Sequence, residues 1–233
     1  MDFPFFYVDT ILEEGAVITP PEETSRHIMQ VLRMREGEQL IITNGHGRSA
    51  VCIIQSTSKK SCTILVGEVT VWPNRKQQIT IAISLLKNAN RFEWFLEKVA
   101  ELGVSRVVPL QCARTEKQHF RIDRAKTILV SALQQSQQAW LTEITEPASL
   151  DAFLQQSFTG SVFIAHCEPS ERQVLSGAGL SAATILIGPE GDFTQLEINA
   201  AIQKGFIPVT LGDTRLRTET AGIVAAVKLM LEN

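Results

Sequence analysis

The sequence has few of the residues from which metal sites, disulfide frameworks and histidine-based triads are built. Its four cysteines form no CxxC pair and no other metal-ligand spacing, and its four histidines are scattered. These residues are Cys52, Cys62, Cys112 and Cys167, with His27, His46, His119 and His166. We therefore expect reduced thiols, no bound metal and no His-based catalytic triad.

We also expect neither a membrane-spanning helix nor a signal peptide. The chain has no uninterrupted apolar run of about 18 residues, which a membrane-spanning helix requires, and residues 1–4 lack the basic and apolar parts of a signal peptide. Walker A, HExxH and G-x-S-x-G motifs are also missing. We therefore predict a cytoplasmic protein, and its composition, 44% hydrophobic and 20% charged, is ordinary for a globular one.

One nucleotide-binding motif is matched by its residues but not by the predicted structure around it. Residues 177–182, Gly-Ala-Gly-Leu-Ser-Ala, match the dinucleotide fingerprint G-x-G-x-x-G/A. That motif needs a strand directly before it, whereas residues 171–176 have the polar character of a helix. We therefore expect no dinucleotide site there.

Charge is distributed unevenly along the chain. The net charge of −3 argues against a protein that binds nucleic acid by bulk charge. Residues 74–126, however, carry 11 Lys and Arg against 5 Asp and Glu, while residues 1–73 carry 6 against 9 and residues 127–233 carry 5 against 11. A basic middle segment can bind a polyanion, but helix surfaces also collect charge without a partner, so charge alone leaves an RNA-binding role open.

Residues 1–73 have the pattern of a small β domain. The expected strands are 5–8, 16–18, 39–43, 48–56 and 61–70, with a helical segment at 20–32. An Asn44-Gly45 turn between two of these strands predicts a hairpin. The region is long enough for a compact barrel of the kind that binds RNA or oligosaccharide. We place the domain boundary at residue 73.

Residues 74–233 alternate between apolar strands and amphipathic helices, which predicts an α/β domain with a parallel sheet. The expected strands are 78–86, 106–109, 161–165, 185–187 and 209–211. Asn90 with Glu93 predicts a helix start, a second helix is expected over 122–138, and a short one begins at Ser149. Thr194 with Glu197 predicts a capping box for a helix over 195–204, and the next helix begins at 218 or 219.

Three of the expected strands break into polar loops, which follow at residues 166–169, 188–191 and 212–217. In open α/β sheets, ligands bind in the crevice beyond the carboxyl ends of the strands. Arg215, Arg217 and Glu219 crowd a helix start, which is suited to anions and polar ligands. The loops therefore predict a ligand site, although βα turns without any ligand have similar glycine and proline content.

The loop residues resemble the paired signature of a known family. Residues 187–191, Ile-Gly-Pro-Glu-Gly, with Leu211-Gly212 and residues 216–221, Leu-Arg-Thr-Glu-Thr-Ala, are similar to the RsmE family. These are the bacterial 16S ribosomal RNA (uridine-N3)-methyltransferases of the SPOUT class. Further matches extend the resemblance over nearly the whole chain: His27, residues 31–33, Gly37, Lys87, Arg91, residues 97–98 and 101–104, Ala132, Gln135 and Ser136.

The resemblance implies a PUA-like β-barrel over residues 1–73 and a SPOUT-type α/β domain over residues 74–233, knotted as a trefoil. It also implies a homodimer that acts on 16S rRNA or the small ribosomal subunit, with S-adenosyl-L-methionine held by the three loops. The implied cofactor-binding residues are His166, Ile187, Gly188, Pro189, Glu190, Gly191, Leu211, Gly212, Leu216, Arg217, Thr220 and Ala221.

Catalytic and RNA-binding roles are assigned on the same basis. We expect Arg217 to stabilise negative charge that develops on the uracil carbonyls, and Glu219 to accept the N3 proton. The alternative for Glu219 is that it only caps its helix and pairs with Arg215 or Arg217. The expected RNA-binding residues are Arg33, Arg35, Lys87, Arg91, Arg114, Lys117 and Gln135, with Arg121 and Arg124 beside them.

The chain departs from the family pattern at three positions. Gln134 and Gln138 stand where an acidic residue and an Arg are common, and Asp192 stands where a second glycine often follows Gly191. Two alternatives therefore stay open. One is a SPOUT methyltransferase acting on tRNA or another rRNA position, and the other is a catalytically inactive RNA-binding ribosome assembly factor.

Overall fold

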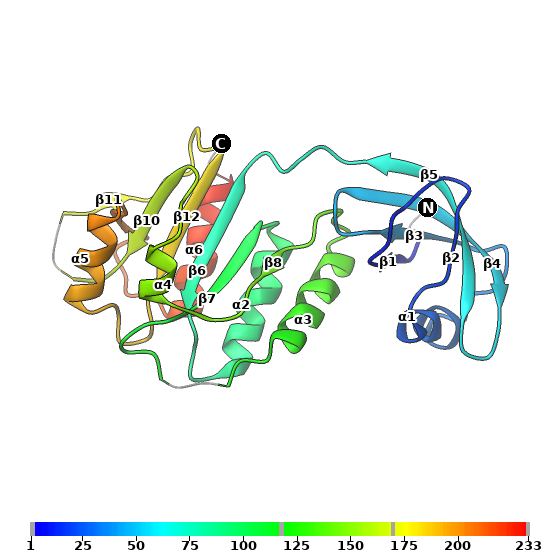
Figure 1. Ribbon diagram of the computed structural model, residues 1–233, viewed down its shortest axis with the longest axis horizontal. Coiled ribbons are helices and arrows are strands. Elements are labelled where there is room, and N and C mark those ends of the chain that lie inside the picture. The colour runs from blue at the N-terminus through cyan, green and yellow to red at the C-terminus, as the bar shows by residue number, and fades with distance from the viewer. Residues whose placement is uncertain (1–2, 117–118, 169–170, 232–233) are drawn as a thin grey trace. The chain divides into compact units, whose positions relative to one another are not determined.

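The computed structural model describes residues 3–116, 119–168 and 171–231, and the chain divides into two compact units (Figure 1). Within the described residues, the first unit comprises the chain up to Asn74 together with Leu133–Leu141. The second comprises Arg75–Ala132 and the chain from Thr142 onward. In these described ranges, no helix is long and apolar enough to cross a membrane.

The first unit is built on a five-stranded sheet, as the alternating sequence predicted. The strand order is β1 (Phe5–Tyr7), β3 (Gln39–Thr43), β4 (Arg48–Thr57), β5 (Cys62–Val71) and β2 (Val17–Ile18). The β3–β4 hairpin is confirmed: Oδ1 of Asn44 accepts hydrogen bonds from the backbone N–H groups of His46, at 2.8 Å, and Arg48, at 3.1 Å. The expected single helix over 20–32 is instead α1 (Glu22–Arg26) followed by a π-helical turn, η1 (His27–Val31).

A short segment from the middle of the chain completes this unit. Gly47 N–H donates to the carbonyl of Ala139, and Leu141 N–H donates to the carbonyl of Gly45, both at 2.8 Å. The indole of Trp140 donates to the carbonyl of Pro73 at 3.1 Å, and its ring fills the space that a side chain at Gly47 would occupy. Residues 133–141 therefore belong to the first unit although they lie well beyond residue 73.

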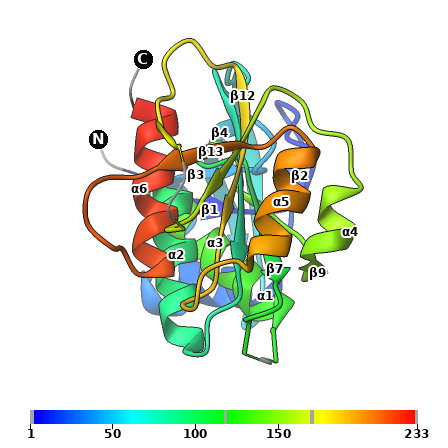
Figure 2. The same ribbon diagram turned by 90° about the vertical axis from the view of Figure 1, so that its left-hand side faces the viewer.

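The second unit is a parallel sheet with helices on both faces (Figure 2). Its strands run in the order β11 (Gln173–Val174), β13 (Ile207–Thr210), β10 (Ser161–Ala165), β12 (Ala182–Ile187), β6 (Gln78–Ser84), β7 (Arg106–Gln111) and β8 (Glu143–Ile144), and β9 (Ala148–Ser149) also pairs with β7. Helices α2 (Ala89–Glu101) and α6 (Thr218–Leu231) cover one face, and α4 (Leu150–Leu154) and α5 (Gln195–Gln203) cover the other. The chain also forms α3 (Ile122–Gln135).

Because both faces are covered, the central strands are mostly apolar. In β6, Ile81 and Ile83 are fully buried or nearly so, as is Ala82, whose side chain joins a core cluster with Phe193 and Ile198. Gly222 lets α6 approach α2 closely, since a Cβ there would lie 2.5 Å from the ring of Phe95 and 2.9 Å from Ile83. The predicted parallel α/β architecture is thereby confirmed.

Helix ends test the local sequence predictions most directly. The capping box of α5 is confirmed, because the Thr194 hydroxyl accepts from Glu197 N–H and the Glu197 carboxylate accepts from Thr194 N–H. The expected start at Asn90 and Glu93 is wrong: the N-cap of α2 is Asn88, whose side chain accepts from Asn90 N–H.

Two further elements differ from expectation. Helix α3 ends at Gln135 rather than 138, and Gln137 has a positive φ of 52° that a continuing helix cannot accommodate. The stretch expected to be helical before Gly177 contains the strand β11 instead. Gly177 itself packs against the backbone of α6 at Lys228 and Leu229, so it serves close packing of that helix.

Candidate active site

The three predicted loops follow three adjacent strands of the sheet. Since β13, β10 and β12 are neighbours and parallel, their carboxyl ends meet at one edge, and the loops line a single cavity of about 490 Å³. We call it the loop cavity, and its walls the β10 loop (residues 166–168), the β12 loop (188–194) and the β13 loop (211–217). Ten of the predicted cofactor-binding residues line it: His166, Ile187, Gly188, Pro189, Glu190, Leu211, Gly212, Leu216, Arg217 and Ala221.

The cavity also contains residues that the sequence did not single out as cofactor-binding. Gly191 and Thr220, which were predicted, are not among the lining residues. The additional lining residues are Ala165, Cys167, Arg172, Asp192, Val209, Thr210, Asp213, Thr214, Arg215 and Thr218. Arg172 had no sequence signal, because it lies outside the strand-loop-helix patterns that identified the other walls.

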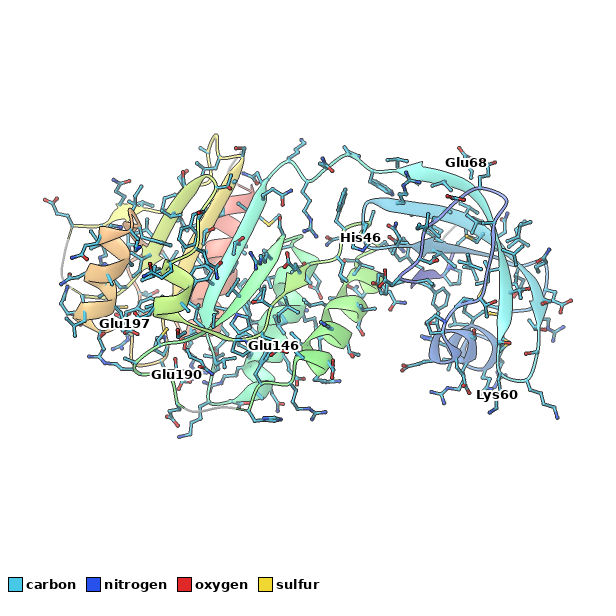
Figure 3. The ribbon with its side chains drawn as sticks, in the orientation of Figure 1. His46, Lys60, Glu68, Glu146, Glu190 and Glu197 are labelled. Carbon is cyan, nitrogen blue, oxygen red and sulfur yellow. The ribbon has the colours of Figure 1, made fainter. Side chains whose placement is uncertain are left out.

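The β12 loop is held in place by contacts from several elements. The Thr218 hydroxyl, at the start of α6, donates to the carbonyl of Gly188 at 3.0 Å, and Nη1 of Arg114 donates to the carbonyl of Gly191 at 2.7 Å. The Glu190 carboxylate, labelled in Figure 3, pairs with Arg91 of α2 at 3.2 Å. This wall of the cavity is therefore fixed before any ligand binds.

Asp192 links this wall to the β10 loop. Its Oδ2 accepts from Cys167 N–H at 2.7 Å, and its Oδ1 accepts from Phe193 N–H at 2.8 Å. Its φ of +63° lies in the left-handed region, which glycine adopts freely and Asp tolerates better than most residues. That conformation accounts for glycine being common at this position in the family that the sequence resembles.

The β13 loop is held by fewer contacts. The Thr210 hydroxyl donates to the carbonyl of Gly212 at 2.9 Å, and Ala221 N–H donates to the carbonyl of Arg217 at 2.7 Å. Gly212 has a φ of +151° with open space where a Cβ would project, so its backbone conformation requires glycine and packing does not. Residues 212–215 and Arg217 are exposed, which leaves the arginine side chains available to a ligand.

His166 presents a buried imidazole in the wall of the cavity. The residue is only 5% exposed, and within the described part of the chain neither ring nitrogen has a hydrogen-bond partner. Burial lowers the pKa of His166, the positive charge of Arg172 acts in the same direction, and Asp192 and Glu168 oppose them. The ring is therefore neutral at neutral pH and offers one donor and one acceptor to a polar ligand.

Glu219 lies beside the cavity rather than in its wall. It is 5% exposed, its Oε1 lies 3.8 Å from Nε of Arg91, and its Oε2 has no hydrogen-bond partner among the described residues. The expected alternative pairing with Arg215 or Arg217 is not what the structure shows, because the cation beside Glu219 is Arg91. Arg91 thus joins Glu190 of the β12 loop to Glu219 of α6.

Several basic side chains predicted to bind RNA have partners within the protein. Lys87 pairs with Glu116 at 2.9 Å, and Arg124 pairs with Glu93 at 3.0 Å. Arg91 and Arg114 bind the β12 loop, as described above. Arg33, Arg35 and Gln135 are exposed, and Arg33 has a positive φ of 55° just after η1. Lys117 lies outside the described residues, and the RNA-binding role of the whole set stays a prediction.

Within the described ranges, no cluster of three or more His, Cys, Asp or Glu residues could hold a metal ion. The loop cavity offers a ligand backbone groups, one neutral imidazole, carboxylates, arginines, threonine hydroxyls and one thiol.

Comparisons with known proteins agree with this geometry. The family described as RNA methyltransferase domain matches residues 73–230, and the RNA methyltransferase PUA domain matches residues 20–67. The chain is 30% identical to the ribosomal RNA small subunit methyltransferase E of Bacillus subtilis, over 92% of this chain and 90% of that protein.

Solved structures are similar along the whole chain. A probable rRNA-methyltransferase from Porphyromonas gingivalis superimposes with a TM-score of 0.87 at 34% identity, covering 98% of both chains. A putative methyltransferase from Legionella pneumophila, solved in complex with the cofactor SAM, has a TM-score of 0.87 at 27% identity, covering 99% of this chain and 98% of that one. The chain, a SPOUT-type α/β domain preceded by a PUA domain, therefore belongs to the RNA methyltransferase family that includes the ribosomal RNA small subunit methyltransferases E.

Proposed function

We propose that this protein transfers a methyl group from S-adenosylmethionine to N3 of a uridine in 16S ribosomal RNA. The observation that carries the proposal is the convergence of three loops, from three adjacent parallel strands, on one cavity. The methyltransferase E relatives supply the substrate class by their name, and the Legionella relative was solved with the same donor. We also propose the catalytic, cofactor-binding and RNA-binding roles that the RsmE resemblance implies for individual residues.

The residues present fit the donor. A volume of about 490 Å³ lies within the range of about 300–1,000 Å³ that is typical of small-molecule sites. Neither ring nitrogen of His166 has a hydrogen-bond partner among the described residues, and a neutral imidazole does not repel a cationic ligand. When bound, S-adenosylmethionine supplies an electrophilic methyl group on a sulfonium. The residues that would hold it are His166, the β12 loop from Gly188 to Glu190, and the β13 loop with Leu216 and Ala221.

Arg217 is the residue that we place in contact with the reacting base. Uridine N3 carries a proton and becomes nucleophilic only as that proton leaves, so negative charge develops on the neighbouring carbonyl oxygens. Arg217 lines the cavity, is exposed, and precedes the first residue of α6, Thr218, where the helix dipole also favours negative charge. Its permanent positive charge therefore lowers the energy of the ionised base.

Glu219 is the proposed acceptor of the N3 proton. Its Oε2 has no hydrogen-bond partner within the described part of the chain, and Arg91 holds its Oε1 side. Because the carboxylate lies outside the lining of the loop cavity, we propose that the base approaches from the side of α2, where Arg91 and Glu219 meet. Glu219→Gln should reduce the transfer rate without weakening donor binding, since the amide retains the shape of the carboxylate.

Partners and location follow from the same proposal. The exposed Arg33 and Arg35 of the first unit would contact RNA phosphates, together with those basic side chains of residues 74–126 that remain accessible. We further propose a homodimer, as the RsmE resemblance implies, and a cytoplasmic location, where ribosomal RNA is made into subunits in bacteria.

Two measurements test the proposed function. Calorimetry should show that the full chain binds S-adenosylmethionine, and mass mapping of small-subunit RNA, with and without the gene, should show one uridine whose N3 methyl group depends on it. Absence of donor binding would favour the inactive assembly factor. Donor binding with a methylated uridine only in tRNA, or at a different rRNA position, would favour a SPOUT enzyme of other specificity.

A further inference from the structure

The charges that line the loop cavity are not equivalent. Three arginines and three carboxylates contribute to the lining: Arg172, Arg215 and Arg217, with Glu190, Asp192 and Asp213. Glu190 is paired with Arg91 at 3.2 Å, and Asp213 is exposed to solvent. Asp192 is half-buried, and in the described part of the chain it forms no ion pair with Lys or Arg. It is therefore the one lining carboxylate, among described residues, that is neither paired nor fully solvated.

The Asp192 charge is also fixed in position. Its two carboxylate oxygens accept hydrogen bonds from Cys167 N–H and Phe193 N–H, at 2.7 and 2.8 Å, so the group cannot rotate away from the cavity without breaking them. The backbone at this position, with a φ of +63°, would accept glycine without strain. Glycine at this position would therefore remove the carboxylate and its bond to Cys167 N–H without straining the backbone.

A fixed negative charge distinguishes two ligands that the rest of the cavity cannot separate easily. S-adenosylmethionine and its demethylated product, S-adenosylhomocysteine, share the adenosine, ammonium and carboxylate groups, and they differ by one methyl group and the positive charge on sulfur. Contacts to the shared groups bind both ligands equally. Contacts to the methyl group and the electrostatic field at the sulfur are what can favour the sulfonium form.

We propose that the Asp192 carboxylate makes the loop cavity prefer the sulfonium donor over the neutral thioether product, an inference that rests on the proposed function. Asp192 is half-buried, and a partly buried charge is screened by salt much less than an exposed one. Its field therefore acts on a ligand in the cavity more strongly than the field of the exposed Asp213. Losing it should lower the preference for donor over product by about 3- to 10-fold.

This preference has a direct use in turnover. Product formed in the cavity no longer benefits from Asp192, so it leaves more readily and fresh donor displaces it. Loss of the Asp192 charge should accordingly raise product inhibition in the methyl-transfer assay.

The test is calorimetric titration of the full-length protein with each ligand separately. Asp192→Asn removes the charge and keeps one hydrogen-bond acceptor, whereas Asp192→Gly removes the whole side chain and suits the positive φ. Both variants should lower the ratio of product Kd to donor Kd by about 3- to 10-fold. Asp213→Asn is the matched control, because it neutralises an exposed carboxylate of the same cavity, and its ratio should stay within about twofold of wild type.

Several outcomes would overturn the inference. If the Asp192 variants lose the same affinity for donor and product, Asp192 acts only as a link between loops. If Asp213→Asn lowers the ratio of product Kd to donor Kd as much as Asp192→Asn does, the preference depends on the total charge of the cavity. If neither Asp192 variant folds, the wild-type ratio still decides, since it must fall as salt rises and a constant ratio contradicts the proposal. Failure of the proposed donor site looks different, because wild type would then bind neither ligand, and a different RNA substrate would leave the affinities for both ligands unchanged.

Discussion

The β12 and β13 loops form opposite kinds of wall around one cavity. The β12 loop receives hydrogen bonds or ion pairs from Arg91, Arg114 and Thr218, and Asp192 ties it to Cys167. Among the described residues, the hydrogen bonds of the β13 loop join it to Thr210 and Ala221, which are close in sequence, and its arginines are exposed. The first wall is therefore preorganised, and the second can adjust.

This difference suggests a division of work in the proposed reaction. A preorganised wall binds the donor at little cost in conformational entropy. An exposed loop with two arginines can respond to the RNA and bring Arg217 to the base. Mutations in the two loops should consequently change different quantities: donor affinity for the β12 loop, and the methyl-transfer rate for the β13 loop.

Arg217→Ala should have the largest effect. Removing the charge that faces the reacting base should lower the methyl-transfer rate by at least about 100-fold, as loss of comparable transition-state contacts does. Donor affinity, measured by calorimetry, should change by less than about threefold, because the β12 loop remains intact. An equal loss in rate and in donor affinity would make Arg217 a donor ligand and would erase the proposed difference between the walls.

Thr218→Val should act on stability and on donor binding together. The valine cannot donate to the carbonyl of Gly188, so a buried acceptor loses its partner, which costs about 1–3 kcal/mol of unfolding free energy. Denaturant titration measures the loss, and Thr218→Ser is the control because it keeps the hydroxyl. A stable valine variant with normal donor affinity would show that this bond does not hold the β12 loop.

His166 should make stability depend on pH. Burial holds the pKa of His166 below its unfolded value, which is about 6.5. As the pH falls below that value, the unfolded chain gains a proton that the folded chain does not, so stability is lost toward acid, by up to about 1.4 kcal/mol per pH unit for one group. In His166→Gln, the difference between the unfolding free energies at pH 7.5 and pH 5.5 should be smaller than in wild type. An unchanged difference would assign the acid sensitivity to other groups.

Arg114→Ala should have the smallest effect on donor binding. It distinguishes support of the β12 loop by Arg114 from binding of an RNA phosphate. If Arg114 supports the β12 loop, its loss weakens donor binding by about threefold and leaves the salt dependence of RNA binding unchanged. If it binds a phosphate instead, the slope of log K against log salt falls by about 0.7–0.9. Arg121→Ala is the control from the same basic segment, and it should leave donor affinity as in wild type.

The parts of the site that could be predicted from the sequence are those set by local rules. The capping box of Thr194 and Glu197 depends on residues three apart, and the three loops each follow their own strand. Parallel strands then place those loops at a common edge. The helix start at Asn90 was wrong because Asn88 offers the same side-chain chemistry two residues earlier, and local patterns do not rank the two.

Contacts between distant segments were beyond local reasoning. The pairing of Arg91 with Glu219 joins α2 to α6, and the bond from Arg114 to Gly191 joins the basic segment to the β12 loop. Composition identified these arginines as a basic patch, but charge counts do not show which cations are already satisfied within the fold. The link from Asp192 to Cys167 was hidden for the same reason.

Because residues 133–141 belong to the first unit, a single cut in the chain cannot separate the two units. The chain passes between its two units after Asn74, after Ala132 and again after Leu141. A cut after residue 74 would strip Gly45 and Gly47 of their main-chain partners and leave the hollow beside Gly47 without the indole that fills it. The N-terminal unit can consequently not be transferred to another protein as one continuous segment. A chimaera that contains it must also contain residues 133–141, either through circular permutation or as a grafted peptide.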